Sequence, residues 1–353
     1  MTHVTDEAWK QQSLPIDHLM AALNLGKDWG MAESDILAST GINMQSGWDK
    51  QKITVGDYLA LINHFETLGK LSQAAMELGW RMPPTAYGAL GFALLCCENM
   101  RQGLSLCDRF WPLVTQDVSA FTFSEQSDVC MVHLEIHPNL TEKERRFWLE
   151  SSLVSWKRCV TLVQGKQNVE TEIWFDFEPP EETWEDEGKF GRIYYNMPIN
   201  QIIFLGVSMD APLPMRNPIA LDTAMKQCEQ ELLLCSPSAY QWLARLQQLM
   251  VIGDDGYPSL RQLADHVSVS ERTLRRHLLK AGSSYQRLLE NAQKRDAVRL
   301  LGNAALTIQR VAELLGYADP ANFTRRFRQW TGSAPNQFRK RMQSKTVQDL
   351  EWA

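Results

Sequence analysis

Apolar residues in the C-terminal third of the chain follow one pattern twice. Two segments, about 259–281 and 307–331, each place apolar residues three and four positions apart over two short runs, which predicts a helix, a tight turn and a second helix. Corresponding residues are 48 positions apart before the turn and 49 after it, so the second turn is one residue longer. We expect the core and turn positions of these pairs to be Ala264, Leu274, Ala312, Gly316, Phe323 and Phe327.

Residues at the expected helix ends support this interpretation. Ser259 and Gln262 have the spacing of a capping box, and Thr307 can cap the corresponding helix of the second copy. Asp319 precedes Pro320, which is a typical helix start. Any two-helix hairpin resembles a single helix-turn-helix unit, but a duplicated unit with a basic second helix is a much more specific signal.

The segment between the two units predicts a spacer helix. Residues 284–301 contain no Gly or Pro and place apolar residues along one face. A helix of this length spans roughly 27 Å, close to the ~34 Å between successive major-groove faces on one side of a DNA duplex. A single chain could therefore contact two adjacent groove segments.

Residues 15–215 predict a separate domain of mixed α+β class, followed by an all-α domain. Between Ile16 and Leu113, three- and four-residue spacing broken by Gly and Ser predicts helices. Further on, alternating apolar positions predict four strands around a helix at Glu142–Leu162. Residues 216–249 are expected to form one connecting helix, which could also serve as a dimer surface, and residues 250–342 form the all-α domain.

Charge divides the chain in the same way. From Arg245 to Lys345 there are 18 Lys and Arg against 8 Asp and Glu, a net charge of +10. The whole chain has a net charge of −6, so the remainder carries −16. A basic segment in an otherwise acidic chain indicates that only this segment binds phosphate groups. The candidate DNA-contacting basic residues of the two second helices are Arg272, Arg275, Arg276, Arg325 and Arg328.

Residues 250–342 resemble the DNA-binding domain of the AraC/XylS family of bacterial transcription regulators. The resemblance is carried by AELLGYADPANFTRRFRQWTGSAPNQFRK around the second unit, including Gly316-Tyr317 and Asn322-Phe323. Ser268 departs from the family pattern, because glycine is frequent at this turn position. The resemblance implies a seven-helix domain with both second helices in the major groove. It assigns base contacts to Arg272, Arg275 and Arg276, and to Pro320, Ala321, Thr324 and Arg325.

Two alternatives remain open for these side chains. A basic helix pair can be only a solvated surface. A single arginine of the set can also contact a phosphate rather than a base, because half or more of protein–DNA hydrogen bonds go to the backbone.

The N-terminal domain resembles the arabinose-binding type of effector domain found in one branch of the same family. The segment AYGALGFALLCCENMRQGLSLCDRFWPLV, Ala86–Val114, carries this resemblance. It implies a domain that senses a small metabolite and can dimerise. The sequence does not assign the residues of the effector pocket.

Other candidate sites fail on physical grounds. Gly88 and Gly91 lack the preceding strand and the third glycine of a dinucleotide motif, so we interpret them as helix-packing glycines. His133, Glu135 and His137 share one strand face, but the two histidines are about 13 Å apart, so we expect a polar outward face rather than a metal site. The seven cysteines show no zinc spacing, and no catalytic constellation is present.

The sequence therefore predicts a bacterial, cytoplasmic transcription regulator, not an enzyme, with no cofactor and no bound metal. The expected partners are promoter DNA, a small-metabolite effector, a second copy of the chain and RNA polymerase, which the family resemblance implies for an activator. One alternative is a constitutive DNA-binding regulator whose N-terminal domain only dimerises. Another is an enzyme fused to a DNA-binding module. The N-terminal sequence is polar and no apolar run is long enough to span a bilayer, so no membrane contact is expected.

Overall fold

The chain divides into two compact units. Unit 1 comprises Met1–Tyr195 and Asn200–Gln241, and unit 2 comprises Asn196–Ile199 and Trp242–Ala353. The computed structural model describes residues 10–40, 52–115, 118–126, 129–181, 188–234, 239–253 and 256–348. Within these ranges, no helix combines the length and the apolar composition needed to cross a membrane.

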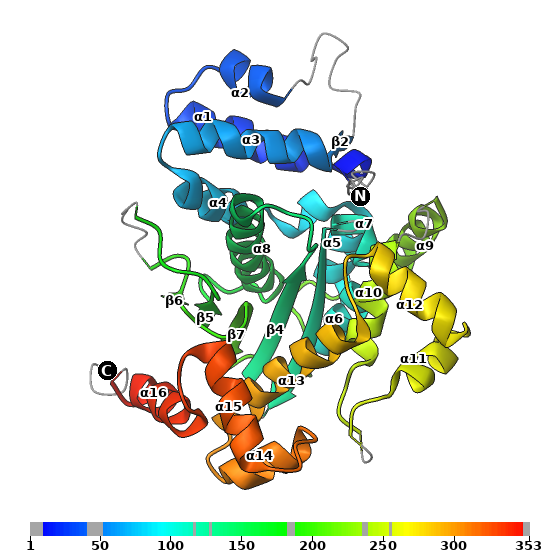
Figure 1. Cartoon of the computed structure of the whole chain (residues 1–353). Coiled ribbons are helices and arrows are strands. Elements are labelled where there is room, and N and C mark those ends of the chain that lie inside the picture. Colours follow the sequence, from blue (N-terminus) through cyan, green and yellow to red (C-terminus); the bar gives the residue numbers. More distant parts are fainter. Residues whose placement is uncertain are drawn as a thin grey trace, which may run out of the picture. The chain divides into compact units, whose positions relative to one another are not determined.

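The first part of unit 1 is helical, as the three- and four-residue spacing predicts. Figure 1 shows α1, α2 and α3 as a layer beside α4, and their apolar side chains form one core cluster. Helix α3 begins at a capping box, in which the Thr54 hydroxyl accepts a hydrogen bond from the Asp57 N–H and the Asp57 carboxylate accepts one from the Thr54 N–H. The helices are α1 (Asp17–Asp28), α2 (Glu33–Thr40), α3 (Val55–Thr67), α4 (Leu71–Trp80), the 3-10 helix η3 (Pro84–Tyr87), α5 (Gly88–Cys96), α6 (Met100–Phe110) and α7 (Pro112–Thr115).

The second part of unit 1 contains a five-stranded sheet in the order β3-β4-β7-β5-β6. All neighbours are antiparallel except β5 and β6, which are parallel. The four predicted strands are confirmed as β3, β4, β5 and β7. The sequence did not predict β6, nor the antiparallel pair β1 and β2, because three residues are too few to show alternation. The strands are β1 (Ser13–Pro15), β2 (Lys52–Thr54), β3 (Ser119–Gln126), β4 (Val129–Ile136), β5 (Thr171–Trp174), β6 (Arg192–Tyr194) and β7 (Gln201–Leu205).

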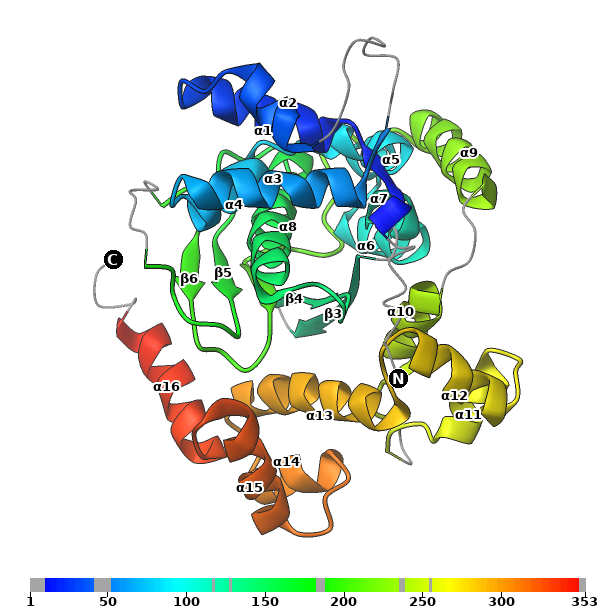
Figure 2. The same ribbon diagram turned by 45° about the horizontal axis from the view of Figure 1, so that its top comes forward.

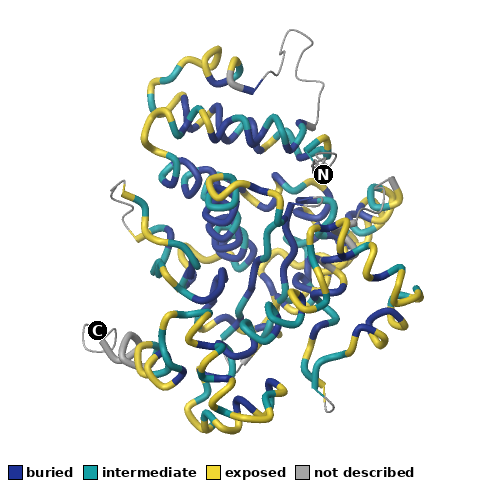
Figure 3. Tube along the Cα trace, in the orientation of Figure 1, coloured by how far each residue is buried: buried dark blue, intermediate teal, exposed yellow. Residues whose placement is uncertain are grey.

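The long helix α8 (Glu142–Val163) connects the helical part of unit 1 to the sheet. It begins at a capping box of Thr141 and Glu144. One side of α8 packs along α4, and another packs against β4, β5 and β7; Figure 2 shows the helix lying over the sheet. Figure 3 shows α8 and β4 as largely buried. Phe147 and Trp148 belong to the core of α1–α4, whereas Leu149 belongs to the core of the sheet.

Two glycines permit close backbone approaches in this helical part. A Cβ atom on Gly79 of α4 would lie 2.2 Å from the Ser151 carbonyl oxygen of α8, and one on Gly91 of α5 would lie 1.6 Å from the Pro84 carbonyl oxygen. The interpretation as a packing glycine is confirmed for Gly91. It is wrong for Gly88, whose φ of 57° turns the chain from η3 into α5 and whose Cβ atom would meet nothing.

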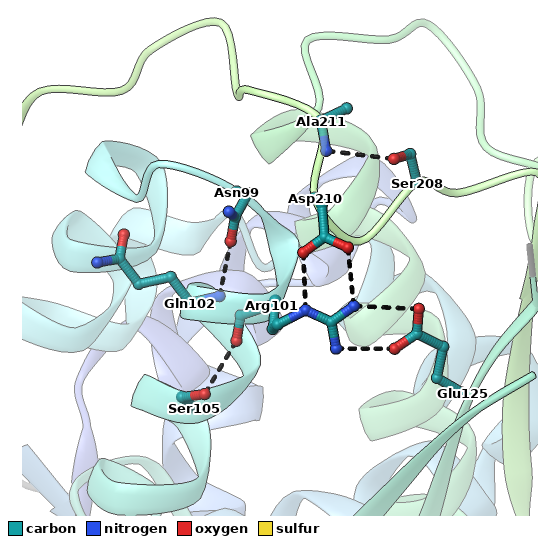
Figure 4. A network of polar contacts seen from close by, with 8 residues as sticks. All are labelled: Asn99, Arg101, Gln102, Ser105, Glu125, Ser208, Asp210 and Ala211. Carbon is teal, nitrogen blue, oxygen red and sulfur yellow. Dashed lines mark hydrogen bonds and ion pairs between the residues drawn. The ribbon is translucent and has the colours of Figure 1, made fainter.

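A charged clamp fixes the start of α6 (Figure 4). The Arg101 guanidinium donates hydrogen bonds to both carboxylate oxygens of Asp210, at 2.7 and 2.9 Å, and to both of Glu125, at 2.8 and 3.2 Å. The paired Arg101 side chain lowers the pKa of Asp210. The clamp thus joins α6, β3 and the loop that follows β7.

The predicted single connecting helix is two helices that belong to different units. Helix α9 (Pro218–Leu234) packs on α5 and α7 and buries Cys228 in the core of unit 1. Most of helix α10 (Ala239–Leu249), from Trp242 onward, lies in unit 2. Pro237 lies between them in the sequence, and proline disfavours helix continuation. Residues 235–238 are outside the described residues.

The interpretation of His133, Glu135 and His137 as an outward polar face is wrong. His133 and His137 are buried. The His133 Nδ1 atom is 2.8 Å from the Asn200 carbonyl oxygen, and its Nε2 atom is 3.6 Å from the Glu135 carboxylate. A polar residue in a strand can lie inside when a neighbouring backbone group supplies its hydrogen bond.

Unit 2 is helical throughout its described secondary structure apart from an isolated bridge between Gly253 and Gly256. Two helix pairs, α11 with α12 and α14 with α15, lie at the predicted segments, and α13 lies at the predicted spacer. The helices after α10 are α11 (Leu260–His266), α12 (Glu271–Lys280), α13 (Tyr285–Gly302), α14 (Ile308–Leu314), α15 (Pro320–Thr331) and α16 (Pro335–Gln348).

Candidate DNA-binding surface and ligand cavity

The two helix pairs of unit 2 have matching helix starts. The Ser259 hydroxyl accepts a hydrogen bond from the Gln262 N–H at the start of α11, and the Thr307 hydroxyl accepts one from the Arg310 N–H at the start of α14. The second helices also have caps, Ser270 on α12 and Asp319 on α15. The caps at Ser259, Thr307 and Asp319 are the predicted ones, and together with Ser270 they fix where the helices of each pair begin.

The turns inside the two pairs also match. The Val269 N–H donates to the Ala264 carbonyl oxygen at 3.0 Å, and the Tyr317 N–H donates to the Ala312 carbonyl oxygen at 2.9 Å. In each pair the N–H group donates to the carbonyl oxygen five positions earlier in the chain. Such a hydrogen bond is typical of a helix end that is followed by a residue with left-handed backbone. The left-handed residues are Ser268, with φ of 55°, and Gly316, with φ of 82°.

The expected core residues of both pairs are buried, whereas Gly316 is exposed in its turn. Ala264 and Ala312 leave room for the second helix to cross the first. In the second pair, the Phe323 ring contacts the rings of Tyr317 and Phe327 at centroid distances of 5.5 and 5.6 Å. Burying these side chains fixes which face of α12 and α15 remains in solvent. The buried core residues are Ala264, Leu274, Ala312, Phe323 and Phe327.

The exposed face of α12 carries the three predicted arginines. Arg272, Arg275 and Arg276 are all exposed. Arg275 lies 3.7 Å from the Glu271 carboxylate, one helical turn away, which is a weak surface ion pair. The face opposite Leu274 and Leu278 is therefore cationic and accessible.

The exposed face of α15 brings four predicted residues together. Ala321, Thr324, Arg325 and Arg328 line one shallow hollow, together with Gln329. The Arg325 guanidinium donates a hydrogen bond of 2.8 Å to the Asn322 side-chain oxygen, which holds it along the helix. The remaining predicted residue, Pro320, is the first residue of α15 and is partly exposed. The sequence reasoning missed Gln329, although its spacing of four from Arg325 puts it on the same face.

A neighbouring arginine of α15 has a structural role instead. Arg326 forms an ion pair of 2.8 Å with Glu290 of α13, and its guanidinium lies 5.8 Å from the centre of the Trp330 ring. The Trp330 indole N–H also donates to Glu290, at 2.8 Å. These contacts fix α15 on α13, so the basic residues of this helix have two separate tasks.

A buried carboxylate in the second half of α13 fixes this helix to other parts of unit 2. Asp296 accepts a hydrogen bond of 2.8 Å from the Tyr257 hydroxyl, and Arg295 and Arg299 contact it at 3.2 and 3.6 Å. Arg295 also donates to the Met250 carbonyl oxygen. Burial, together with the Asp296 charge, raises the pKa of Tyr257. The network ties α13 to the end of α10 and to the segment before α11.

Unit 1 contains a cavity between its two core clusters. Its walls come from α1, α3, α4, η3, α5, α6, α7 and α8. Trp111 and Trp156 stack at a centroid distance of 5.4 Å along one wall. The sequence assigned no residue to this pocket. The serines at 151, 152 and 155 were the available signal, because their spacing of one and four puts them close together on the surface of α8.

Among the described residues, no group of three or more His, Cys, Asp or Glu side chains lies in an arrangement that could hold a metal ion. The six described cysteines are free. Burial raises the pKa of Cys97 and Cys159 to about 12, so these thiols are protonated at neutral pH.

Comparisons with known proteins agree with the two-unit organisation. Residues 30–213 match the family described as the arabinose-binding domain of AraC transcription regulator, and residues 263–341 match a helix-turn-helix domain family. An HTH-type transcriptional regulator from Mycobacterium tuberculosis is 27% identical over 341 residues, covering 93% of this chain and 96% of the relative. The ornithine utilization regulator from Pseudomonas aeruginosa is 23% identical over 329 residues, covering 93% and 96%.

A solved structure is also similar. The transcriptional regulator CdpR from Pseudomonas aeruginosa is 21% identical and aligns over 92% of this chain and 98% of its own, with a TM-score of 0.40.

Proposed function

The chain belongs to the AraC family of transcription regulators, and from this membership we propose that α12 and α15 are its two DNA-recognition helices. The chain itself is a DNA-binding transcription regulator and not an enzyme, so an enzyme fused to a DNA-binding module is set aside. In the proposal, unit 2 binds a promoter and unit 1 binds a small effector that controls this binding.

One observation carries the proposal for DNA reading. Ala321, Thr324, Arg325 and Arg328 line a single exposed hollow on α15, while Phe323 and Phe327 of the same helix are fully buried. A recognition helix needs this division, with one face fixed by packing and the other carrying donors that can reach base edges and phosphates.

The proposed contacts differ along each helix. Residues near the start of a recognition helix contact base edges, so Pro320, Ala321, Thr324 and Arg325 of α15 are assigned to bases. Arg328, one turn further on, is assigned to a phosphate. On α12, Arg272, Arg275 and Arg276 contact the other groove segment, with α13 as the spacer.

Selection of DNA from a random pool by the full-length protein tests this proposal. Two half-elements with centres about 10–10.5 base pairs apart are expected, because successive major-groove faces recur at one helical turn. Enrichment without a sequence motif, or a single element only, would contradict the two-helix assignment.

We propose control by an effector rather than constitutive binding, because the cavity lies between the two cores of unit 1. A ligand there would touch both the helical layer and the sheet-bearing part, and could shift the population between arrangements of them. In a constitutive regulator whose first domain only dimerises, no ligand of the cavity would change the affinity for DNA.

The remaining assignments rest on family membership. We propose that the chain acts in the cytoplasm as a homodimer and activates transcription by contact with RNA polymerase. Mass measurement of the purified chain in solution tests the dimer, and transcription from a selected site with purified polymerase tests activation. A monomer at micromolar concentration would contradict the proposed dimer, and a reduced amount of transcript would contradict activation.

A further inference from the structure

Among the described residues, no Asp, Glu, Lys or Arg side chain lines the cavity in unit 1. Its polar lining consists of hydroxyl, thiol, indole and imidazole groups. A charged ligand buried there would lose its hydration without gaining a counter-charge, which is costly. The rest of the lining is made of aliphatic and aromatic side chains.

The titratable groups of this lining are uncharged at neutral pH. Burial lowers the pKa of His18 to about 4, so its imidazole is neutral. Burial raises the pKa of Cys159 to about 12 and raises the pKa of Cys107, so both thiols keep their protons. The pKa values of Tyr58 and Tyr87 are raised for the same reason.

Two hydrogen-bond donors of the lining have no partner. The indole N–H groups of Trp148 and Trp156 are buried and donate to no acceptor among the described residues. The third tryptophan of the cavity differs, since the Trp111 N–H donates to the Ser119 carbonyl oxygen at 3.0 Å. Buried indole N–H groups usually have a partner, so an unpaired one on the cavity lining can receive an acceptor that a ligand brings.

The size of the cavity restricts the ligand further. It offers about 70 Å³ to the centres of water-sized molecules. One water needs about 10–15 Å³ on this measure, so the space holds roughly five to seven groups of that size. This is the size of one small ring with a single substituent.

We propose that unit 1 binds an uncharged, mainly apolar small molecule with one carbonyl or ether oxygen, which accepts a hydrogen bond from Trp148 or from Trp156. The inference rests on the proposed effector control of this regulator and specifies the chemical class of the effector. It excludes sugars, which need many polar partners, and amino acids, which need two counter-charges.

Binding of matched six-membered rings to the full-length protein tests the class. Cyclohexanone supplies the carbonyl acceptor, and cyclohexanecarboxylate and cyclohexylammonium supply a negative and a positive charge on the same ring. Ligand-observed NMR titration gives each affinity. We expect cyclohexanone to bind and both ions to bind at least tenfold more weakly.

Tryptophan variants locate the contact. In Trp148→Phe and Trp156→Phe an aromatic ring remains but the donor is removed, so cyclohexanone should bind roughly two- to tenfold more weakly in the variant that lacks the contacting donor. Trp29→Phe, which changes a tryptophan outside the cavity lining, should leave the affinity unchanged. Thermal unfolding of each variant without ligand verifies that it remains folded.

The outcomes separate this inference from effector control. Equal or tighter binding of either ion, absent binding of cyclohexanone, or unchanged affinity in both cavity variants would overturn the proposed class. DNA affinity at a selected site, measured with and without cyclohexanone, is a separate readout. If cyclohexanone binds as predicted but leaves DNA affinity unchanged, the cavity assignment stands and effector control by this ligand fails.

Discussion

Ser268 and Gly316 occupy the same turn position in the two helix pairs, and both have a left-handed backbone, with φ of 55° and 82°. They lie 48 residues apart, as the sequence repeat requires. A residue with a Cβ atom pays about 1–2 kcal/mol for this conformation, whereas glycine adopts it freely. The first pair therefore carries a strained turn that the second pair lacks.

Exchange of these turn residues should change local stability in opposite directions. Ser268→Gly should stabilise the α11–α12 pair by about 0.5–1 kcal/mol after allowing for the greater entropy of unfolded glycine, and Gly316→Ser should destabilise the α14–α15 pair by about 1 kcal/mol. Hydrogen exchange of the amides in each pair measures both effects. Slower exchange after Gly316→Ser would be inconsistent with the left-handed turn.

Arg325 and Arg328 should affect DNA binding differently. Arg325→Ala should reduce affinity for a selected site by about 1–3 kcal/mol and relax base preference at one position. Arg328→Ala should weaken all sequences similarly and reduce the slope of log affinity against log salt by about 0.9. Anisotropy titrations at several salt concentrations distinguish the two. The same salt slope in wild type and Arg328→Ala would rule out the phosphate contact.

Tyr257→Phe should destabilise unit 2 by about 1.5–3 kcal/mol, because the lost hydrogen bond is made to the buried Asp296 carboxylate. Tyr285→Phe is the matched control, since the Tyr285 hydroxyl donates to a neutral acceptor, the Pro258 carbonyl oxygen, at 3.1 Å. Its cost should be about 0.5–1.5 kcal/mol. Urea unfolding followed by hydrogen exchange in α13 measures both. A larger loss in Tyr285→Phe would contradict the role given to Asp296.

The stability of unit 1 should fall as the pH drops from about 6.5 to 4. His18 is buried with its pKa lowered to about 4, mainly by desolvation, and the Tyr58 and Tyr87 rings contact its edge. In this pH range the unfolded chain binds a proton on His18 that the folded chain does not, so unfolding becomes more favourable, by up to about 3 kcal/mol at the acid end. Unfolding at several pH values, compared with His18→Asn, isolates this contribution. If the stability of His18→Asn depends on pH in the same way as that of the wild type, His18 does not cause the loss of stability.

The helix pairs were predictable because every signal was local. The caps at Ser259 and Asp319, the small residue Ala264 and the apolar spacing each act within one or two turns of chain, and each agrees with the observed boundaries. Once the buried face of each helix is known, the opposite face is the exposed one, so the exposed faces were predictable too. Which exposed arginine is held by another helix was not predictable, because the Arg326–Glu290 pair joins residues 36 positions apart.

Unit 1 was less predictable, because its site depends on long-range packing. The cavity brings His18 of α1 beside Tyr58 of α3 and Tyr87 of η3, and no local pattern specifies these contacts. The burial of His133 depends on the Asn200 carbonyl oxygen, 67 residues away. Strand β6 was missed because its three residues show no period.

Genome-wide DNA occupancy of the intact protein, beside an Arg276→Ala, Arg325→Ala double variant, tests the central claim most directly. Arg245→Ala, an exposed arginine of α10 outside both recognition helices, controls for lost charge. If α12 and α15 recognise DNA, the wild type and Arg245→Ala give discrete peaks, and the double variant loses these peaks although it remains folded and equally abundant. The same peaks in the double variant would contradict DNA recognition by α12 and α15.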